Sequence, residues 1–349
     1  MNDELKPSLK GLDLPELVRL LEPLGARAFH ARQIMAWFYQ RGVSDFSQMT
    51  DLSMKLREGL MAGFRADELR IKTGRTSRDG SRKVLYQAGD GKLLESVLIP
   101  SPGRFTACLS TQLGCRLQCA FCATGAIGFE RDLAPGEIVD QLFHLQHLAG
   151  WENRITNVVF MGMGEPLLNY ARTLAAARLI NSHRGFNIGA RHITISTAGV
   201  VPGILRLARE PEQFKLAISL NATTDQARSR LMPINRKHPI NELLAAAREY
   251  TKIRGKLVFF EYILLSGVND TQDDARRLAE LLRGIPGKVN LIPFNPGDGS
   301  QGLRPSTPQS QQAFFDSLHR LGVPVTIRMS KGRDIKAACG QLRALSRNV

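Results

Sequence analysis

Hydrophobic positions divide the chain into a helical beginning and a longer part in which strands and helices alternate. In the first 60 residues, apolar side chains recur at the three- and four-residue intervals of a helix. They predict helices over 14–24 and 28–40 and a third that begins at Ser53. Basic residues between these positions predict a bundle with a cationic outer face, which either contacts RNA or is only solvated. These residues are His30, Arg32, Arg41, Lys55 and Arg57.

A β-hairpin is predicted after the helices. Lys83–Ala88 and Leu93–Ile99 have the composition of strands, and Gly89-Asp90-Gly91 between them is a turn signal. Glu95 lies in the second strand, where a single acidic side chain usually faces solvent. A basic run with interleaved Gly and Ser precedes the hairpin and offers a surface for an RNA backbone. The run consists of Arg70, Lys72, Arg75, Arg78, Arg82 and Lys83.

Strand-like and helix-like segments alternate from about residue 105 onward, which predicts parallel βα units. The predicted strands are Ala107–Thr111, Ile155–Met161, His192–Ser196, Lys215–Leu220, Val258–Leu265 and Val289–Pro293, with a final one over Val323–Ile327. The predicted helices are Gly136–Leu148, Arg172–Ile180, Pro202–Ala208, Ile240–Arg254, Ala275–Arg283 and Gln309–Leu321. The expected fold class is therefore α/β, a (βα)6 partial TIM barrel.

Three parts are expected along the chain. Residues 1–65 form a helical accessory domain that contacts RNA, residues 66–104 a β-hairpin linker, and residues 105–349 the partial barrel, whose C-terminal loop carries Cys339. In such barrels the chemistry takes place at the C-terminal ends of the strands.

The charge balance adds a statement about partners. The 349 residues include 47 basic and 32 acidic side chains, a net charge of +15. This excess favours a polyanionic partner, most often nucleic acid, although a merely basic enzyme is the alternative. The sequence has no run of about 18 apolar residues, and its polar N-terminus lacks a signal-peptide core. We therefore expect a cytoplasmic protein without membrane contact.

The cysteines are the strongest chemical signal in the chain. Three of the five fall in Cys115-Arg116-Leu117-Gln118-Cys119-Ala120-Phe121-Cys122, and no fourth Cys or His lies nearby in sequence. Thiolates bind iron–sulfur clusters, zinc or Cu(I). Three thiolates on a 4Fe–4S cluster leave one iron open to a small molecule. The alternative is a zinc site completed by a distant His, Cys108 or Cys339, although zinc motifs usually come as two C-x2-C pairs.

This spacing resembles the signature of the radical S-adenosylmethionine (SAM) superfamily, in which the open iron binds the amino acid end of SAM. Gly164-Glu165-Pro166, after the second barrel strand, resembles the superfamily element that holds the SAM amino group. Polar residues at other strand ends predict the rest of a SAM pocket. They are Ser196, Thr197, Ser219, Asn221 (with Leu220 between the last two) and Asn295.

Two cysteines remain outside the triple. Cys108 lies in the first barrel strand, where its side chain can face the interior. Cys339 lies near the C-terminus beside a Lys/Arg-rich loop, and we expect that positive field to favour its thiolate. A thiolate in a barrel with SAM is a candidate methyl acceptor.

The whole chain resembles the RlmN family, the bacterial dual-specificity methyltransferases of carbon 2 of adenine in 23S rRNA and tRNA. The resemblance extends from end to end and includes the helical N-terminal region. Its motifs are Leu113-Gly114-Cys115 with the triple, Ala123-Thr124-Gly125, Gly128-Phe129-Glu130-Arg131, Met163-Gly164-Glu165-Pro166-Leu167-Leu168-Asn169, Ser196-Thr197-Ala198-Gly199, Ile292-Pro293-Phe294-Asn295-Pro296 and Arg333-Asp334-Ile335 before Cys339. Asn221 stands where the family often has His, so its side-chain role is open.

The resemblance implies a mechanism with two SAM molecules per turnover. One methylates Cys339, and the other is cleaved at a 4Fe–4S cluster on Cys115, Cys119 and Cys122 to a 5′-deoxyadenosyl radical. That radical takes hydrogen from the methyl group on Cys339, and the resulting carbon radical adds to adenine. Cys108 then resolves the protein–RNA adduct through a transient Cys108–Cys339 disulfide, with Glu95 as proton acceptor.

The resemblance also implies an electron donor such as flavodoxin and a monomeric enzyme. Three other functions stay open at this point. One is the related methyltransferase of adenine carbon 8, which confers antibiotic resistance, and another is a radical SAM enzyme that acts on a peptide or small molecule. The third is a non-catalytic, zinc-bearing RNA-binding protein.

Overall fold

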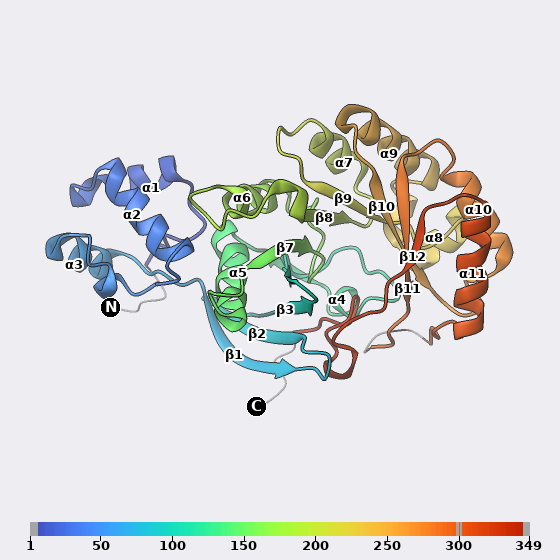
Figure 1. Cartoon of the computed structure of the whole chain (residues 1–349), viewed down its shortest axis with the longest axis horizontal. Helices are drawn as coiled ribbons and strands as arrows, with labels where there is room; N and C mark the ends of the chain where they lie inside the picture. Colours follow the sequence, from blue (N-terminus) through green and yellow to red (C-terminus); the bar gives the residue numbers. More distant parts are fainter. Residues whose placement is uncertain (1–5, 298–299, 301, 345–349) are drawn as a thin grey trace.

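The computed structural model describes residues 6–297, 300 and 302–344, and its elements confirm the α/β class (Figure 1). The helical beginning comprises α1 (Leu14–Leu21), α2 (Ala28–Tyr39) and α3 (Met54–Gly63). Asp13 starts α1 with a reciprocal capping box to Glu16, and the Ser53 side chain caps α3 at the predicted position. These helices form a separate group beside the sheet (Figure 1).

Six parallel strands form the predicted partial barrel. In spatial order they are β4 (Arg104–Cys108), β7 (Ile155–Phe160), β8 (Ile193–Thr197), β9 (Lys215–Ser219), β10 (Val258–Leu264) and β11 (Gly287–Pro293). The short β12 (Val325–Ile327) adds to β11, also in parallel, as predicted. The barrel helices are α5 (Pro135–Ala149), α6 (Tyr170–Asn181), α7 (Val201–Ala208), α8 (Asp225–Leu231), α9 (Ile240–Arg254), α10 (Gln272–Leu281) and α11 (Pro308–Arg320).

An antiparallel extension continues the same sheet beyond β4. It consists of β1 (Leu69–Thr76), β2 (Arg82–Ala88) and β3 (Leu93–Ser101), and β3 pairs with β4. The hairpin of β2 and β3 was predicted, whereas strand β1, which carries Arg70, Lys72 and Arg75 of the basic run, was not. Side chains from Arg70 to Thr76 are all exposed. An edge strand without a buried face lacks the alternation by which strands are recognised in a sequence.

Two further differences lie near the cysteines. The predicted strand Ala107–Thr111 ends at Cys108. Leu109 N–H still donates to Val159 of β7, and Thr111 N–H donates to Met163 in the segment after β7. A separate two-stranded sheet of β5 (Gln112–Gly114) and β6 (Phe129–Asp132) was not predicted, because strands this short carry no periodicity. The triple and the short α4 (Ala123–Ala126) lie between them.

A buried ion pair joins the N-terminal segment to the barrel. Lys10 Nζ lies 2.7 Å from Asp140 Oδ1 of α5, and both side chains are fully buried. Lys10 also stands over the Phe143 ring at 3.4 Å, and Asp140 Oδ2 accepts the N–H groups of Glu68 and Leu69 at 2.8 Å. Burial opposes ionisation of Asp140, but Lys10 outweighs it and holds the pKa of that carboxyl below its usual range.

Replacing Lys10 with methionine is expected to lower the free energy of unfolding by roughly 3–5 kcal/mol, because the buried carboxylate of Asp140 would lose its lysine counter-charge. The midpoint of urea unfolding measures this. Arg276→Met is the control: it breaks an exposed pair with Asp273, whose side chains are 61% and 67% exposed, and should change stability by less than about 1 kcal/mol. Equal effects of the two substitutions would contradict the role given to Lys10.

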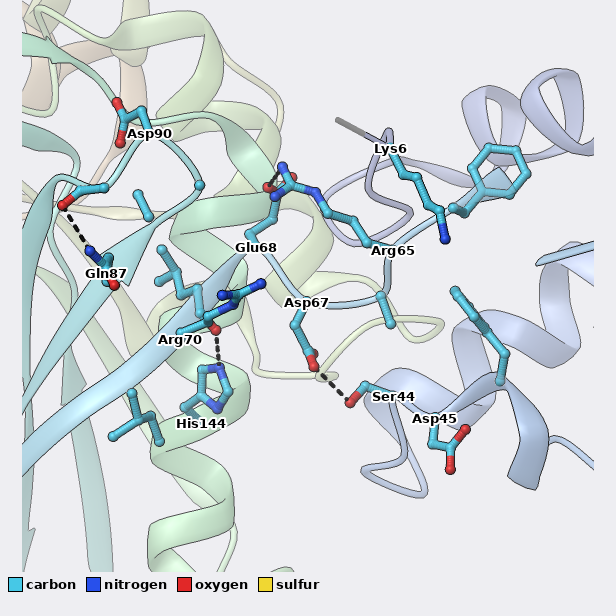
Figure 2. A pocket seen from close by; sticks show the side chains of 18 of the residues that line it. Lys6, Ser44, Asp45, Arg65, Asp67, Glu68, Arg70, Gln87, Asp90 and His144 are labelled. Atoms are coloured by element: carbon cyan, nitrogen blue, oxygen red, sulfur yellow. Dashed lines mark hydrogen bonds and ion pairs between the residues drawn. The ribbon is translucent and has the colours of Figure 1, made fainter. Parts of the chain in front are cut away.

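Figure 2 shows a cavity of about 1120 Å³ between the helical group, β1 and the β2–β3 turn. Its lining carries both signs of charge: Arg65 Nη2 pairs with Glu68 at 2.7 Å, and Ser44 Oγ donates to Asp67 at 3.2 Å. None of the predicted cysteines or SAM-pocket residues lines it. The predicted chemistry therefore lies elsewhere.

Candidate active site

The predicted site residues gather at the C-terminal ends of the parallel strands. Cys108 is the last residue of β4 and Thr197 the last of β8, while Glu165 and Asn295 follow β7 and β11 by a few residues. Since neighbouring parallel strands end at the same edge, one face of the barrel receives them all.

Glu165 is the buried carboxylate of this face. It is 3% exposed, its Oε2 accepts Ala198 N–H at 2.7 Å, and its Oε1 accepts Leu167 N–H at 3.1 Å. Burial raises the pKa of Glu165 to about 7, against the lowering effect of these hydrogen bonds. A ligand ammonium would supply the counter-charge that Glu165 lacks.

The turn before Glu165 requires glycine. Gly164 has a φ of +101°, and a Cβ there would lie 2.5 Å from the Cβ of Gln112. Gln112 also holds the turn directly: its Oε1 accepts Glu165 N–H at 2.8 Å, and its Nε2 donates to Asp132 at 2.7 Å. Gln112 could not be selected from the sequence, because a single polar residue after a predicted strand carries no motif.

Ser110 connects three segments of the site and was also missed. Its fully buried hydroxyl donates to the Glu95 carbonyl at 2.6 Å and accepts Met163 N–H at 2.8 Å. The Gln141 side chain of α5 bonds to both the N–H and the carbonyl of Ser110, at 2.8 and 3.0 Å. Strand β3, the segment after β4 and the Gly164–Pro166 turn are thereby fixed to one another.

The small polar residues of β8 and β11 have structural partners of their own. Ser196 Oγ donates to the Phe160 carbonyl at 2.6 Å, and Thr197 Oγ1 accepts the N–H groups of Gly199 and Val200 at 3.0 and 3.1 Å. Asn295 Nδ2 donates to Ser330 Oγ at 2.7 Å. Asn295 Oδ1 is buried with no hydrogen-bond partner among the described residues, which leaves an acceptor for a ligand.

The end of β9 is held by a buried arginine. Arg228 of α8 donates to the carbonyls of Ser219 (3.1 Å), Leu220 (3.0 Å) and Ala198 (2.6 Å). Asn221 has a φ of +56°, and its Oδ1 accepts Ile263 N–H at 2.8 Å. The Asn221 side chain thus serves the protein's own backbone. Arg228 was missed because no helix was predicted over Asp225–Leu231, a segment of seven residues.

The three cysteines of the triple lie close together, with Cys115 buried and Cys119 and Cys122 partly buried. Burial raises the pKa of Cys115 to about 12, with Cys122 and Glu165 adding to it, and burial raises that of Cys119 strongly, with Cys122 and Cys115 adding to it. Thiolates in such surroundings are stable only when a cation binds them. All three are free, as cluster ligands must be.

The donor set fits an iron–sulfur cluster. Thiolates are soft donors, and each of the three can bind a different iron of one cluster. The soft donors, their number and their buried site therefore match a 4Fe–4S cluster that keeps one iron without a protein ligand.

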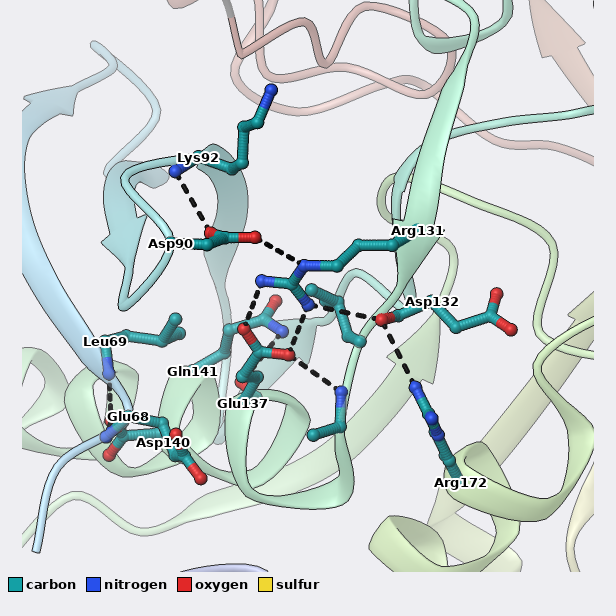
Figure 3. Close-up of polar contacts among 12 residues, drawn as sticks. Glu68, Leu69, Asp90, Lys92, Arg131, Asp132, Glu137, Asp140, Gln141 and Arg172 are labelled. Carbon is teal, nitrogen blue, oxygen red and sulfur yellow. Dashed lines mark hydrogen bonds and ion pairs between the residues drawn. The ribbon is translucent and has the colours of Figure 1, made fainter. Parts of the chain in front are cut away.

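The loop that carries the triple is tied down after Phe129 (Figure 3). Arg131 of β6 donates through both terminal nitrogens to Glu137 of α5 at 2.8 Å, and through Nε to Asp90 of the β2–β3 turn at 2.6 Å. Two parallel bonds from a guanidinium fix direction as well as distance. The exit of the cysteine loop is thus anchored to two separate elements.

Cys108 and Cys339 line one cavity of about 210 Å³, together with Arg328. Burial raises the pKa of Cys108 to about 12, with Cys339 adding to it and Arg328 opposing it. Burial also raises the pKa of Cys339, and Arg328 again opposes it. The prediction that nearby cations favour the Cys339 thiolate is wrong. Lys331, Arg333 and Lys336 are exposed to solvent, so the effect of burial on the pKa of Cys339 outweighs theirs, and Arg328 is the cation that lowers this pKa.

Glu95 is buried rather than solvent-facing. It is 5% exposed, with Oε1 2.9 Å from Lys83 Nζ and Oε2 accepting Arg343 N–H at 2.9 Å. Its strand, β3, places Val97 opposite Cys108. Glu95, the predicted proton acceptor, therefore lies between Lys83 and the backbone of Arg343, in the segment that follows Cys339.

Among the described residues, no helix has the length and apolar character needed to cross a membrane.

Comparisons with known proteins agree with one another. Residues 109–282 match the radical SAM superfamily, and residues 8–65 match the ribosomal RNA large subunit methyltransferase N-terminal domain. A dual-specificity RNA methyltransferase RlmN of Anaeromyxobacter dehalogenans is 47% identical, over 97% of this chain and 92% of its own length. The RlmN of Halorhodospira halophila is 46% identical, over 96% and 92%. A solved radical SAM methyltransferase from Sphaerobacter thermophilus superposes with a TM-score of 0.94 at 44% identity, over 97% of this chain and 100% of that one.

Proposed function

The chain belongs to the RlmN family of radical SAM RNA methyltransferases, and from this we propose that it methylates carbon 2 of adenine in 23S rRNA and in the tRNA anticodon loop. The observation that carries the proposal is the cavity shared by Cys108 and Cys339. Direct methyl transfer from SAM to a nucleophilic nitrogen or oxygen of RNA needs no cysteine. Carbon 2 of adenine is not nucleophilic, so a methyl group has to reach it by a radical route.

Each cofactor has candidate residues. Cys115, Cys119 and Cys122 would hold the 4Fe–4S cluster, and Gly164, Glu165 and Pro166 the SAM amino group. Ser196, Thr197, Ser219, Leu220, Asn221 and Asn295 would line the rest of the SAM pocket, with Asn221 acting through its backbone. When bound, the cluster supplies the electron that cleaves SAM to a radical. Two SAM molecules are needed per turnover, one for this cleavage and one as the methyl donor.

The two other cysteines and Glu95 carry out the protein's own steps. Cys339 loses its proton, with Arg328 beside it, and accepts a methyl group. Because that carbon joins adenine as a radical, the adduct loses one electron, which the oxidised cluster would take back, and Glu95 takes the proton from carbon 2. The Cys108 sulfur attacks the Cys339 sulfur, the bond from Cys339 to the carbon breaks, and protonation leaves a methyl group on RNA. The disulfide is reduced before the next turnover.

The remaining parts of the proposal concern partners. Residues 1–65 would serve as an RNA-contacting accessory domain and residues 66–104 as a linker to the barrel, with the exposed cations of β1 beside the RNA backbone. A small electron donor such as flavodoxin would reduce the cluster of a monomeric, cytoplasmic enzyme.

The position of the methyl group decides the proposal. The purified enzyme, reconstituted with iron and sulfide and reduced anaerobically, is incubated with unmodified 23S rRNA fragments and tRNA. Digestion and mass mapping of the nucleosides should show 2-methyladenosine in both. Exclusive 8-methyladenosine would assign the chain to the resistance-type reaction instead, and bound zinc without SAM cleavage would end the enzyme hypothesis.

Glu165→Gln is expected to weaken SAM binding roughly 10- to 100-fold, because a neutral amide replaces the charged partner of the ammonium group. The pKa of Glu165 is raised to about 7, so its carboxylate is lost as the pH falls through that value. SAM affinity of the unchanged protein should therefore decline between about pH 7 and pH 5, by up to roughly tenfold per unit. The variant should not show this decline. Calorimetry across this range measures both, and an unchanged pH profile in the variant would exclude Glu165.

A further inference from the structure

The segment that carries Cys339 is fastened to a turn some 250 residues earlier in the chain. We call residues 332–341 the Cys339 loop and residues 77–81, between β1 and β2, the latch turn. Asp79 Oδ2 accepts the N–H of Gly332 at 2.8 Å. Ser77 Oγ donates to Asp334 Oδ1 at 2.5 Å. These bonds join the antiparallel extension to the start of the loop.

The latch turn also has hydrogen bonds of its own that do not involve the loop. Ser77 N–H donates to the Ser81 carbonyl at 2.8 Å, and Ser81 N–H donates to the other oxygen of Asp79 at 2.9 Å. Burial opposes ionisation of Asp79, but the bonds from Gly332 and Ser81 outweigh it and lower the pKa of Asp79 to about 2. One carboxylate therefore closes its own turn and holds the backbone of the loop with a charge-assisted bond.

The held residue is the point at which the loop changes direction. Gly332 has a φ of +67°, and a Cβ there would lie 2.8 Å from the Cβ of Ala337. Its carbonyl accepts Ala337 N–H at 2.8 Å, so residues 332–337 form a compact turn. Because Cys339 follows that turn by two residues, fixing Gly332 restricts where Cys339 can lie.

The other end of the loop is fastened to the cluster-binding segment. Ala123 N–H donates to the Gly340 carbonyl, and Thr124 Oγ1 donates to the Leu342 carbonyl, each at 2.7 Å. Cys339 therefore stands between two attachments, one near the triple and one on the latch turn. The first attachment belongs to the cofactor site, whereas the second is remote from it.

We propose that Ser77 and Asp79 are positioning residues, which hold the start of the Cys339 loop so that the Cys339 thiol stays in the cavity that it shares with Cys108. The inference rests on the proposed function in one respect, the reaction between these two cysteines. Without the latch, the loop samples more positions, and the effective concentration of Cys339 toward Cys108 falls.

Thiol–disulfide equilibrium measures that concentration. The full-length, cluster-loaded protein is equilibrated anaerobically with glutathione buffers, in which one oxidised glutathione converts the two thiols to a disulfide and yields two reduced glutathiones. Alkylation and peptide mass then give the oxidised fraction of the Cys108–Cys339 pair. Asp79→Ala and Asp334→Ala should each lower the equilibrium constant for forming the disulfide about tenfold. This corresponds to a rise of about 30 mV in the reduction potential of the cysteine pair. Asp79→Asn keeps only one of the two acceptor oxygens that Gly332 and Ser81 use, and it should lower the constant by less than Asp79→Ala does, about threefold.

A matched control and a second readout separate the possible failures. Asp45→Ala removes a carboxylate that caps another short turn, through Ser47 N–H at 2.9 Å, and should leave the equilibrium unchanged. Amide hydrogen exchange of the peptide 332–343 should accelerate in Asp79→Ala but not in Asp45→Ala. If neither the equilibrium nor the exchange responds, the latch is refuted. If the unchanged protein forms no Cys108–Cys339 disulfide, the proposed resolving reaction fails. The latch is then judged by hydrogen exchange alone: faster exchange in Asp79→Ala supports it, and unchanged exchange refutes it.

Discussion

Replacing Cys339 with alanine is expected to abolish RNA methylation, a loss of at least about a thousandfold, the scale on which removal of a covalent nucleophile is felt. The substitution leaves the triple and Glu165 in place, so the protein should still bind its iron and SAM. It removes the one sulfur on the loop, and with it the atom that receives the methyl group. Transfer of labelled methyl from SAM to RNA measures the loss, and the intact mass of the protein shows whether a methyl group is still added to it.

Cys339→Ser is the matched variant, since it keeps the size and polarity of the side chain but offers an oxygen of far lower nucleophilicity. It should be as inactive as the alanine variant, while iron content and SAM affinity stay at the level of the unchanged protein. Methylated RNA at the normal rate from either variant would contradict the carrier role of Cys339. Loss of iron in either variant would mean that the loop supports the cluster site as well.

The ligands and the reactive cysteines could be proposed from sequence because their chemistry is tied to residue type and spacing. Cys115, Cys119 and Cys122 need no knowledge of packing to be recognised as a set of soft donors. The barrel followed from periodicity: α9 spans Ile240–Arg254 as predicted, because its apolar face repeats regularly and Gly255 ends it with a φ of +58°.

The residues that hold the site in shape could not be proposed in this way. Gln112, Ser110 and Arg228 are ordinary polar residues whose roles arise from segments that only the fold brings together. Strands β1, β5 and β6 escaped prediction because the first has no buried face and the others span three or four residues. The prediction of a favoured Cys339 thiolate also failed, because it considered only the cations nearby in sequence. Burial by residues from the whole surrounding volume raises the pKa of Cys339 and outweighs those exposed cations.

Replacing Cys108 with alanine is expected to trap RNA on the protein, with turnover falling to at most one event per enzyme. Cys339 can still be methylated and joined to adenine, but among the residues that line the shared cavity no second thiol remains to attack it. Removing one buried sulfur at the end of β4 should destabilise the fold by only about 1–2 kcal/mol, so the variant should stay folded. A denaturing gel of labelled RNA, with intact mass of the retarded species, detects the covalent product.

The double variant Cys108→Ala/Cys339→Ala supplies the control, because trapping through Cys339 requires that sulfur and must vanish without it. Repeated turnover by Cys108→Ala with no retarded RNA would remove Cys108 from the mechanism and leave the shared cavity unexplained. Trapping that persists in the double variant would place the covalent bond on another residue. Trapped RNA in the single variant alone links the two cysteines to one adduct: Cys339 forms the bond to RNA and Cys108 is needed to break it.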